Sequence, residues 1–332
     1  MAPPADKSAG SPAIVQSEDS ATPAVRAFEL THDFGELRAV DHVNFDVRRG
    51  EVFGLVGPDG AGKSTLIRML ATVLSPSEGD AEVFGASVLR SAAAVKPRIG
   101  YMSQRFSLYG DLTVRENVDF FADLRGVPRR ERSERAESAL SFAGLSAFQN
   151  RLAEHLSGGM KQKLALAVTL MHDPDLLLLD EPTTGVDPVS RREFWRIISD
   201  LHRRGISVLV ATPYMDEAER CSRVAFMDGG RLLLCDTPSA IAQRVPGTLI
   251  ELSTERQRDA IALLEGRAGV TSVVLFGDAV RVLVAPEGPS AADLAAELEL
   301  KGVTVRDTRV ARMDMEAAFA FLFAESRGGG AS

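Results

Sequence analysis

The stretch that most restricts what this chain can fold into is Gly57-Pro58-Asp59-Gly60-Ala61-Gly62-Lys63-Ser64-Thr65, which fits the phosphate-binding pattern G-x-x-x-x-G-K-[ST]. The apolar run at residues 52–56 precedes it and predicts a buried strand. Glycines let backbone N–H groups surround phosphate oxygens, and a helix beginning near Gly62 directs its positive end toward the same anion. Lys63 adds a cation, and Ser64 can ligate Mg²⁺. The strand before and the helix after disfavour the alternative of a glycine-rich turn without a ligand, so we expect a P-loop for a nucleoside triphosphate.

Two carboxylates, Asp180 and Glu181, directly follow the apolar run at residues 176–179. Such a run predicts a buried strand, and ligands of open α/β sheets lie at the carboxyl ends of the strands. In a P-loop fold the first acid holds Mg²⁺ and the second aligns the attacking water. The alternative, a strand end capped before Pro182, is disfavoured by the P-loop in the same chain.

The order of apolar runs predicts an α/β domain over residues 25–240. Short runs between residues 25 and 56 favour antiparallel strands that lead into the P-loop strand. A helical pattern follows, and it predicts an insertion at about residues 105–172. Strand and helix then alternate through 176–179, 189–203 and 206–211, and a hairpin over 224–235 closes the domain. We expect a mixed sheet with antiparallel N-terminal strands and a helical insertion.

The pattern restarts after Pro246-Gly247 and predicts a second, smaller domain over residues 247–325. Strands are expected at 248–252, 272–276, 280–284 and 303–306, with helices ending near Gly266 and spanning 291–300. This β-α-β-β-α-β order is typical of a ferredoxin-like α+β sandwich. A last helix at 313–323 would cover it, and residues 326–332 are expected to be a disordered tail. No catalytic constellation stands out, so an interaction or dimerisation module is expected.

Length and composition restrict the partners. With 332 residues, one large and one small domain are expected. A formal charge of −8 gives no overall attraction to nucleic acid, so we expect no nucleic-acid partner. Cys221 and Cys235 have no Cys or His at metal-ligand spacing and are expected to be reduced core residues. No apolar run approaches the ~20 residues that span a bilayer, and residues 1–24, which lack the apolar core of a signal peptide, are expected to be a disordered tail.

A second candidate anion site lies at Leu156-Ser157-Gly158-Gly159-Met160-Lys161-Gln162, where a glycine pair precedes an apolar helix. Ser157 and the N–H groups of Gly158 and Gly159 would face an anion at the helix N-terminus, although an ordinary helix cap has the same pattern. At this point the chain resembles the ATP-binding cassette (ABC) ATPases. LSGGMKQ is similar to their signature motif, GPDGAGKST to Walker A, and LLLLDEP to Walker B, in family order and at family spacing over about residues 26–240.

The resemblance implies further roles. Phe34 stands where the family stacks an aromatic ring on adenine. Gln104 matches the glutamine that meets Mg²⁺ and the membrane partner, so Ser64, Gln104 and Asp180 form the implied metal set, with Glu181, Gln104 and Lys63 as the implied catalytic set. Residues 184–187 match the D-loop. The family also implies ATP and Mg²⁺ as cofactors and a dimer in which each site combines the Walker residues of one chain with the signature of the other.

Two positions depart from the family pattern. Asp59 replaces the usual Asn of the P-loop, which adds some repulsion toward phosphate at a position where the backbone does most of the binding. Pro213 occupies the position at which the family carries a histidine that contacts the γ-phosphate. Proline has no side-chain donor, so this contact is lost and slow hydrolysis is expected.

Together these features predict the ATP-binding subunit of an ABC exporter of the drug, antibiotic or polysaccharide type, an ATP hydrolase at the cytoplasmic face of the cell membrane. Its expected partners are membrane-spanning permease subunits and a second nucleotide-binding subunit. Phe106, Leu108 and Tyr109 are candidates for the docking surface, although packing under the insertion would explain them equally. One alternative is a catalytically weak or regulatory subunit, which Pro213 favours and Glu181 opposes. Another is a soluble ABC ATPase acting on ribosomes or DNA, which the single cassette and the acidic charge oppose.

Overall fold

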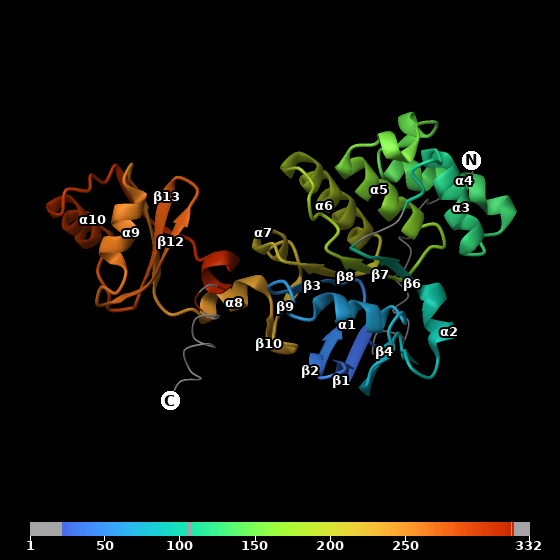
Figure 1. The fold of residues 1–332 in the computed structure, drawn as a ribbon, viewed down its shortest axis with the longest axis horizontal. Coiled ribbons are helices and arrows are strands. Elements are labelled where there is room, and N and C mark those ends of the chain that lie inside the picture. The colour runs from blue at the N-terminus through green and yellow to red at the C-terminus, as the bar shows by residue number, and fades with distance from the viewer. Residues whose placement is uncertain (1–21, 105–107, 320, 322–332) are drawn as a thin grey trace, which may run out of the picture.

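The computed structural model describes residues 22–104, 108–319 and 321. Its elements form two units, a larger one from β1 to α8 and a C-terminal one from β11 to β14 (Figure 1). Of the predicted tails, only residues 22–24 lie within the described residues, and Ala24 is buried and donates a backbone hydrogen bond to Val47 O at 2.8 Å. Ala24 therefore extends the first strand pairing and does not belong to a tail. Phe106 also lies outside the described residues.

A six-stranded sheet forms the centre of the larger unit, in the order β10-β9-β3-β8-β7-β6. The strands are β3 (Val52–Val56), β6 (Ile99–Met102), β7 (Leu176–Asp180), β8 (Ser207–Thr212), β9 (Arg223–Asp228) and β10 (Arg231–Asp236). All pairs are parallel except β10 with β9. Every residue of β3, β7 and β8 is buried, as continuous apolar runs in a parallel sheet covered on both faces require.

A second sheet is antiparallel, in the order β2-β1-β4-β5, and accounts for the short N-terminal runs. Its strands are β1 (Val25–Phe34), β2 (Leu37–Val47), β4 (Glu78–Val83) and β5 (Ala86–Ser87). Helix α1 (Lys63–Leu70) packs between the two sheets, since its buried Leu66 and Leu70 share one apolar core with Leu30 of β1 and Leu55 of β3 (Figure 1). This packing holds the N-terminus of α1 near the carboxyl end of β3, with residues 57–62 between them.

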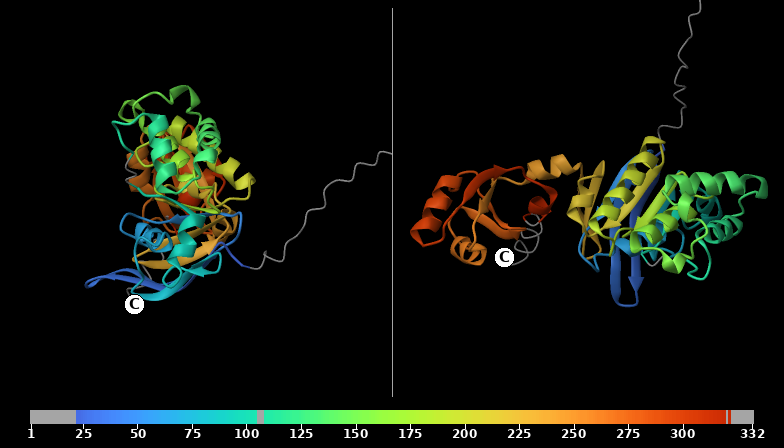
Figure 2. Two further views of the ribbon diagram at one scale, coloured as in Figure 1. Left: turned by 90° about the vertical axis from the view of Figure 1, so that its right-hand side faces the viewer. Right: turned by 90° about the horizontal axis from the view of Figure 1, so that it is seen from above.

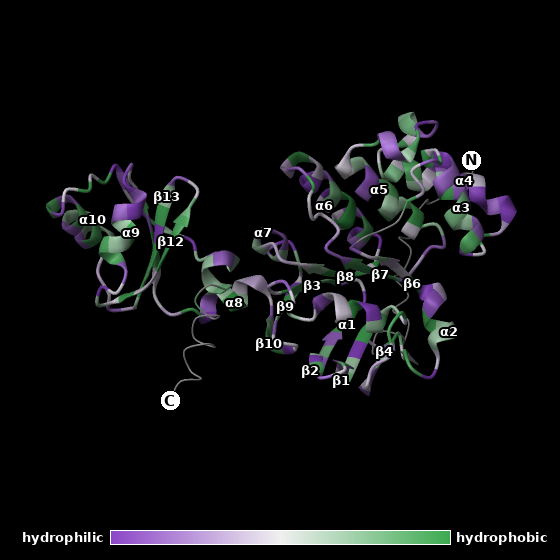
Figure 3. Ribbon diagram, in the orientation of Figure 1, coloured by the Kyte–Doolittle hydropathy of each residue, from purple (hydrophilic) through white to green (hydrophobic). Residues whose placement is uncertain are grey.

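Helices cover the opposite face of the six-stranded sheet. The remaining helices of the larger unit are α2 (Ala92–Val95), α3 (Val114–Leu124), α4 (Arg129–Phe142), α5 (Gly158–Thr169), α6 (Pro188–Arg203), α7 (Met215–Ala218) and α8 (Pro238–Arg244). α3, α4 and α5 build a core of their own around Val118, Leu140 and Leu164, which confirms the helical insertion. Figure 3 shows apolar residues concentrated on the central strands of the six-stranded sheet, near β3, β7 and β8. No helix within the described residues has the length and apolar character needed to cross a membrane.

The C-terminal unit has the predicted ferredoxin-like architecture. Its elements are β11 (Thr248–Ser253), α9 (Gln257–Leu264), β12 (Val270–Phe276), β13 (Ala279–Val284), α10 (Ala291–Leu300) and β14 (Asp307–Ala311), and the sheet order is β12-β13-β11-β14. The predicted strand at 303–306 is wrong. Val303 is buried and its N–H caps α10 by donating to Leu298 O at 2.8 Å, so the apolar signal there belongs to a helix end and the strand begins at Asp307.

Residues 315–319 and 321 are helical and join the two units. The helix predicted at 313–323 was expected to cover the C-terminal unit. Met315 and Phe321 share an apolar cluster with Leu249 of β11 and also with Phe226 of the larger unit. The Phe319 ring stacks on Phe226 with 4.9 Å between centroids. Figure 2 shows the C-terminal unit beside the larger one, attached through this region.

Candidate nucleotide site

The P-loop runs from the end of β3 to the start of α1 and takes a shape that only glycine allows at two points. Gly62 has φ 101°, and a Cβ there would lie 2.2 Å from Ala39 O. A Cβ on Gly57 would lie 2.0 Å from Met227 O. Larger residues would therefore push the loop off β9 and β2. Asp59 is exposed at the tip of the loop, where water screens its charge.

Lys63 is the first residue of α1 and is almost fully buried, with 3% exposure. Its Nζ donates hydrogen bonds to Gly57 O at 2.8 Å and Pro58 O at 2.9 Å, and it lies 3.8 Å from Glu181 Oε1. Burial lowers the pKa of Lys63, while the charges of Glu181, Asp59 and Asp180 act in the opposite direction. The loop thus holds a cation within reach of any anion that its N–H groups bind.

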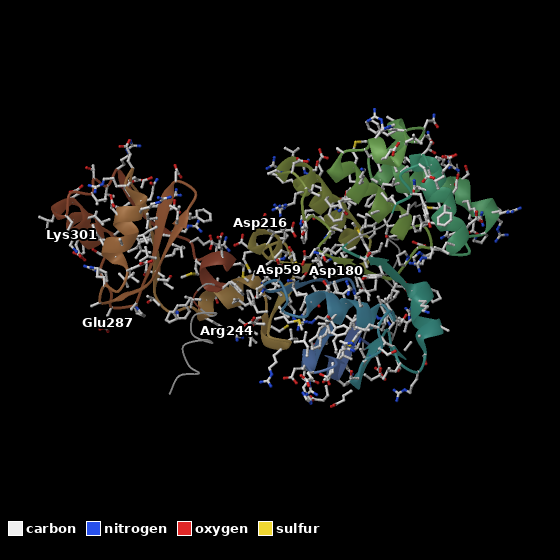
Figure 4. The ribbon with its side chains drawn as sticks, in the orientation of Figure 1. Asp59, Asp180, Asp216, Arg244, Glu287 and Lys301 are labelled. Atoms are coloured by element: carbon white, nitrogen blue, oxygen red, sulfur yellow. The ribbon has the colours of Figure 1, made fainter. Side chains whose placement is uncertain are left out.

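Ser64 and Asp180 form a pair of oxygen donors beside the loop. Ser64 Oγ donates to Asp180 Oδ1 at 2.8 Å, and Asp180 is fully buried at the end of β7. Asp180 Oδ2 has no hydrogen-bond partner among the residues that the structure describes. Burial raises the pKa of Asp180, the Ser64 hydrogen bond lowers it, and the charge of Glu181 raises it further. A hydroxyl next to a buried carboxylate with an unpaired oxygen is the donor set that suits a hard divalent cation such as Mg²⁺. Figure 4 labels Asp59 and Asp180 in the central part of the larger unit.

Glu181 is held against the same region by one side chain of its own loop and one from just beyond the end of β6. Its Oε2 accepts hydrogen bonds from Gln104 Nε2 at 2.9 Å and Thr184 Oγ1 at 3.2 Å. Its backbone has φ 49°, a left-handed conformation that costs a non-glycine residue about 1–3 kcal/mol. The structure therefore brings together Lys63, Ser64, Asp180, Glu181 and Gln104, as the motifs predict.

The other candidate residues lie elsewhere on the chain. Phe34 ends β1 with a half-exposed ring that meets His32 edge-on at 4.4 Å, so one side of the ring remains accessible. Ser157 caps α5 by accepting from Met160 N at 3.3 Å, and Ser157 and Gly158 are exposed. A Cβ on Gly159 would lie 2.4 Å from Ser190, so this glycine lets α5 pack closely on α6. Within the described residues, no hydrogen bond or ion pair joins Ser157–Gly159 to the P-loop.

Sequence reasoning missed one group near the site. Glu217 of α7 is fully buried, although it lies in a charged stretch that resembles an exposed helix start. The sequence around it does not indicate its burial, because two of its partners, Thr183 and Arg191, are distant in the sequence. The cysteines behave as predicted: Cys221 is buried with its pKa raised by burial, Cys235 is partly buried, and both are free. Among the residues described, no cluster of three or more His, Cys, Asp or Glu could hold a metal.

A glycine-rich loop between a parallel strand and a helix, with two carboxylates at the end of a neighbouring strand, defines a P-loop nucleotide-binding protein. The family described as ABC transporter matches residues 40–184. The probable multidrug ABC transporter ATP-binding protein YbhF of Escherichia coli K12 is 46% identical over 214 residues, covering 64% of this chain and 37% of that protein. This chain thus spans well under half the length of that relative.

In two further comparisons, this chain covers more of the protein that it matches. The Nod factor export ATP-binding protein I of Paraburkholderia xenovorans LB400 is 37% identical over 258 residues, covering 76% of this chain and 85% of that protein. A dimeric post-hydrolysis structure of the ATP-binding cassette MJ0796, bound to ADP and phosphate, has a TM-score of 0.58 and 26% identity, covering 64% of this chain and 98% of that one. This chain belongs to the ABC transporter family, among its ATP-binding proteins.

Proposed function

We propose that this chain is the ATP-hydrolysing subunit of an ABC exporter and couples MgATP binding and hydrolysis to transport through separate membrane subunits. The observation that carries the proposal is the set of five side chains at the carboxyl ends of β3, β6 and β7. Asp180 Oδ2 is buried beside Ser64 with no hydrogen-bond partner in the described part of the chain, and Glu181 is held by Gln104 within 3.8 Å of Lys63. An unpaired buried carboxylate oxygen is costly, and a bound cation would offset that cost.

The proposed roles follow from this geometry. Lys63 and the N–H groups of residues 57–65 bind the phosphates, and Phe34 offers a ring face to adenine. Ser64, Asp180 and Gln104 would hold Mg²⁺, which when bound supplies positive charge against the developing phosphate charge. Glu181 orients and deprotonates the attacking water. Its Oε2 is held by Gln104 and Thr184, whereas its Oε1 lies beside Lys63 and therefore next to the phosphate-binding loop. Each of these five side chains already lies within hydrogen-bond or ion-pair range of another member of the set, so little reorganisation would be needed.

The proposal includes a second nucleotide-binding subunit. Ser157 and Gly158 are exposed at the start of α5, and Ser157, Gly158 and Gly159 make no bond to the P-loop of their own chain within the described residues. A head-to-tail dimer would place this helix start against the nucleotide of the partner. The dimeric cassette MJ0796 supports such an arrangement by similarity.

We further propose that membrane-spanning permease subunits bind this chain at the cytoplasmic face of the membrane. The names of two relatives contain multidrug transport and Nod factor export, which favours export as the direction. Tyr109 is 46% exposed and packs edge-on against the half-exposed Phe120 at 4.7 Å, forming an apolar surface on the helical insertion that suits a protein partner. Leu108 faces the core of the insertion and contributes less.

A catalytically weak subunit is the second candidate function, because Pro213 follows β8 where a histidine would reach the γ-phosphate. Tyr214 is poorly placed to replace it, since its ring lies under the guanidinium of Arg191 at 4.2 Å. We therefore propose slow hydrolysis at a site that retains Glu181. The same chain would then act largely by ATP-driven closure.

Steady-state turnover of the purified chain tests both candidates. We expect MgATP hydrolysis that stops in EDTA and rises when the native membrane subunits are present. Binding of MgATP without turnover, with or without those subunits, would support the weak subunit. Failure to bind nucleotide at all would overturn both, as would failure to co-purify with any polytopic protein from native membranes.

A further inference from the structure

Glu217 makes contacts that the proposed reaction does not yet use. Its carboxylate is fully buried in α7 and accepts a hydrogen bond from Thr183 Oγ1 on one oxygen and from Thr212 Oγ1, at 2.6 Å, on the other. Arg191 Nε of α6 lies 3.8 Å from the first oxygen. A buried carboxylate is costly unless it is well paired, so these partners define where Glu217 can be.

The two threonines belong to the segments that carry the reacting groups. Thr183 lies two residues beyond Glu181, and Thr212 is the last residue of β8 and directly precedes Pro213. The parallel pairing of β7 with β8 ends at Asp180 and Ala211. Beyond that point the backbone is joined by Glu181 N donating to Ala211 O at 3.0 Å, and the Glu217 carboxylate then bridges the two diverging chains.

This bridge explains how a strained residue is held in place. Glu181 has φ 49°, and such a conformation persists only where surrounding contacts determine it. Its backbone N–H is fixed by β8, and Thr183 fixes the chain on its other side through Glu217. Thr212 Oγ1 also accepts from Tyr214 N at 3.1 Å while it donates to Glu217. One carboxylate thus sets both the turn that carries Glu181 and the turn that carries Pro213.

We propose that Glu217 is a positioning residue for ATP hydrolysis, which holds Glu181 and the 213–214 segment at the distances that the attacking water requires. The inference rests on the proposed function, because it assigns a role at the same site. Small displacements of a catalytic base lower the rate strongly while ground-state binding changes little. A purely structural bridge would lower stability without this effect on the rate.

The test removes the bridge one hydroxyl at a time in the full-length chain. Thr183→Val keeps the side-chain shape, and we expect kcat to fall about fivefold to tenfold, the effect of one lost hydrogen bond, with KM for ATP within about twofold of the wild type. Thr183→Ser keeps the hydroxyl and should restore kcat. Thr254→Val is the matched control: Thr254 is also buried and donates to Thr304 O at 2.8 Å in the C-terminal unit, so this variant should lower the melting temperature without changing kcat.

Glu217→Gln and the double variant that combines it with Thr183→Val complete a double-mutant cycle for this contact. If the two residues act through one contact, the double variant should lose little more than the more impaired single variant. Wild-type kcat in folded Thr183→Val and Thr212→Val, or equal losses in the Val and Ser variants, would overturn the positioning role. A wild-type chain that binds MgATP but never hydrolyses it would instead count against the proposed function.

Discussion

The buried charged side chains of the two units differ in how completely they are paired. In the larger unit, Lys63, Asp180, Glu181 and Glu217 are buried together at one edge of the sheet, where one oxygen is unpaired and one backbone is strained. In the C-terminal unit, the buried Arg281 is bonded to Glu251 at 3.3 Å and to Asp314 at 2.5 Å, and it lies over the Phe276 ring. The buried charges at this edge of the larger unit are incompletely paired, whereas the buried Arg281 of the C-terminal unit has two carboxylate partners.

This difference indicates a division of labour. At the edge of the six-stranded sheet, a strained backbone and an unpaired buried oxygen coincide with the P-loop and the two carboxylates, which supports our proposal that this edge carries the chemistry. The core of the C-terminal unit consists of aliphatic residues such as Ile250, Val282 and Leu298, and its ion pairs are mostly at the surface, where each contributes little. We therefore expect substitutions in the larger unit to affect catalysis and those in the C-terminal unit to affect stability or assembly.

The largest effect is expected for Lys63→Ala. The P-loop would lose its buried side-chain cation against the β- and γ-phosphates, so kcat/KM should fall about a thousandfold or more, with MgATP binding lost or strongly weakened. Nucleotide binding and turnover measured on the purified variant provide the check. Lys301→Ala is the matched control, since Lys301 is half-exposed on α10 and pairs with Glu297 at 2.9 Å (Figure 4). Equal behaviour of the two variants would contradict the P-loop assignment.

Glu181→Gln should have the next largest effect. The amide keeps the shape of the carboxylate but cannot deprotonate water, so kcat should fall about a hundredfold to ten-thousandfold while MgATP still binds. The variant should accumulate as an ATP-bound dimer, which size-exclusion chromatography would detect. Glu251→Gln makes the same chemical change in the C-terminal unit, where it removes a partner of Arg281. It should lower the melting temperature and leave kcat unchanged, whereas a reversed pattern would contradict the division of labour.

Much of the catalytic edge was predictable because its parts are local. The P-loop and Asp180-Glu181 each follow an apolar run, and parallel strands end at the same edge of a sheet, so the motifs alone place Lys63 and Glu181 together. Glu217 could not be predicted, because its burial depends on threonines 34 and 5 residues away in the sequence. The last strand was misplaced at 303–306 for a similar reason: Val303 is apolar because it closes α10, a tertiary role that periodicity does not reveal.

Pro213→His tests the departure from the family pattern and is expected to have a moderate effect. A histidine would add a hydrogen bond to the transition state, worth about 1.5–3 kcal/mol, so kcat should rise roughly tenfold to a hundredfold while ATP affinity changes little. Single-turnover and equilibrium-binding measurements separate the two quantities. An unchanged or lower rate in a folded variant that binds ATP would mean that the loop is arranged around the proline.

The smallest effect on catalysis is expected where the two units meet, at Phe319. Its ring stacks on Phe226 of β9, and Phe226 in turn pairs with Val56, the residue before the P-loop. Phe319→Ala should lower the free energy of unfolding by about 2 kcal/mol, less than for a fully buried ring because Phe319 is only partly buried. Denaturant melts followed by circular dichroism would measure this loss.

Turnover should nevertheless stay within about twofold of the wild type, because β9 is bonded to β3 on one side and to β10 on the other and does not depend on Phe319 for its position. Phe276→Ala is the control, since that ring lies on β12 within the C-terminal unit and contacts Arg281 rather than the larger unit. A kcat loss well above twofold in Phe319→Ala but not in Phe276→Ala would show that the stacked pair transmits the state of the C-terminal unit to the P-loop. The second unit would then regulate catalysis, and the separation of roles between the units would be wrong.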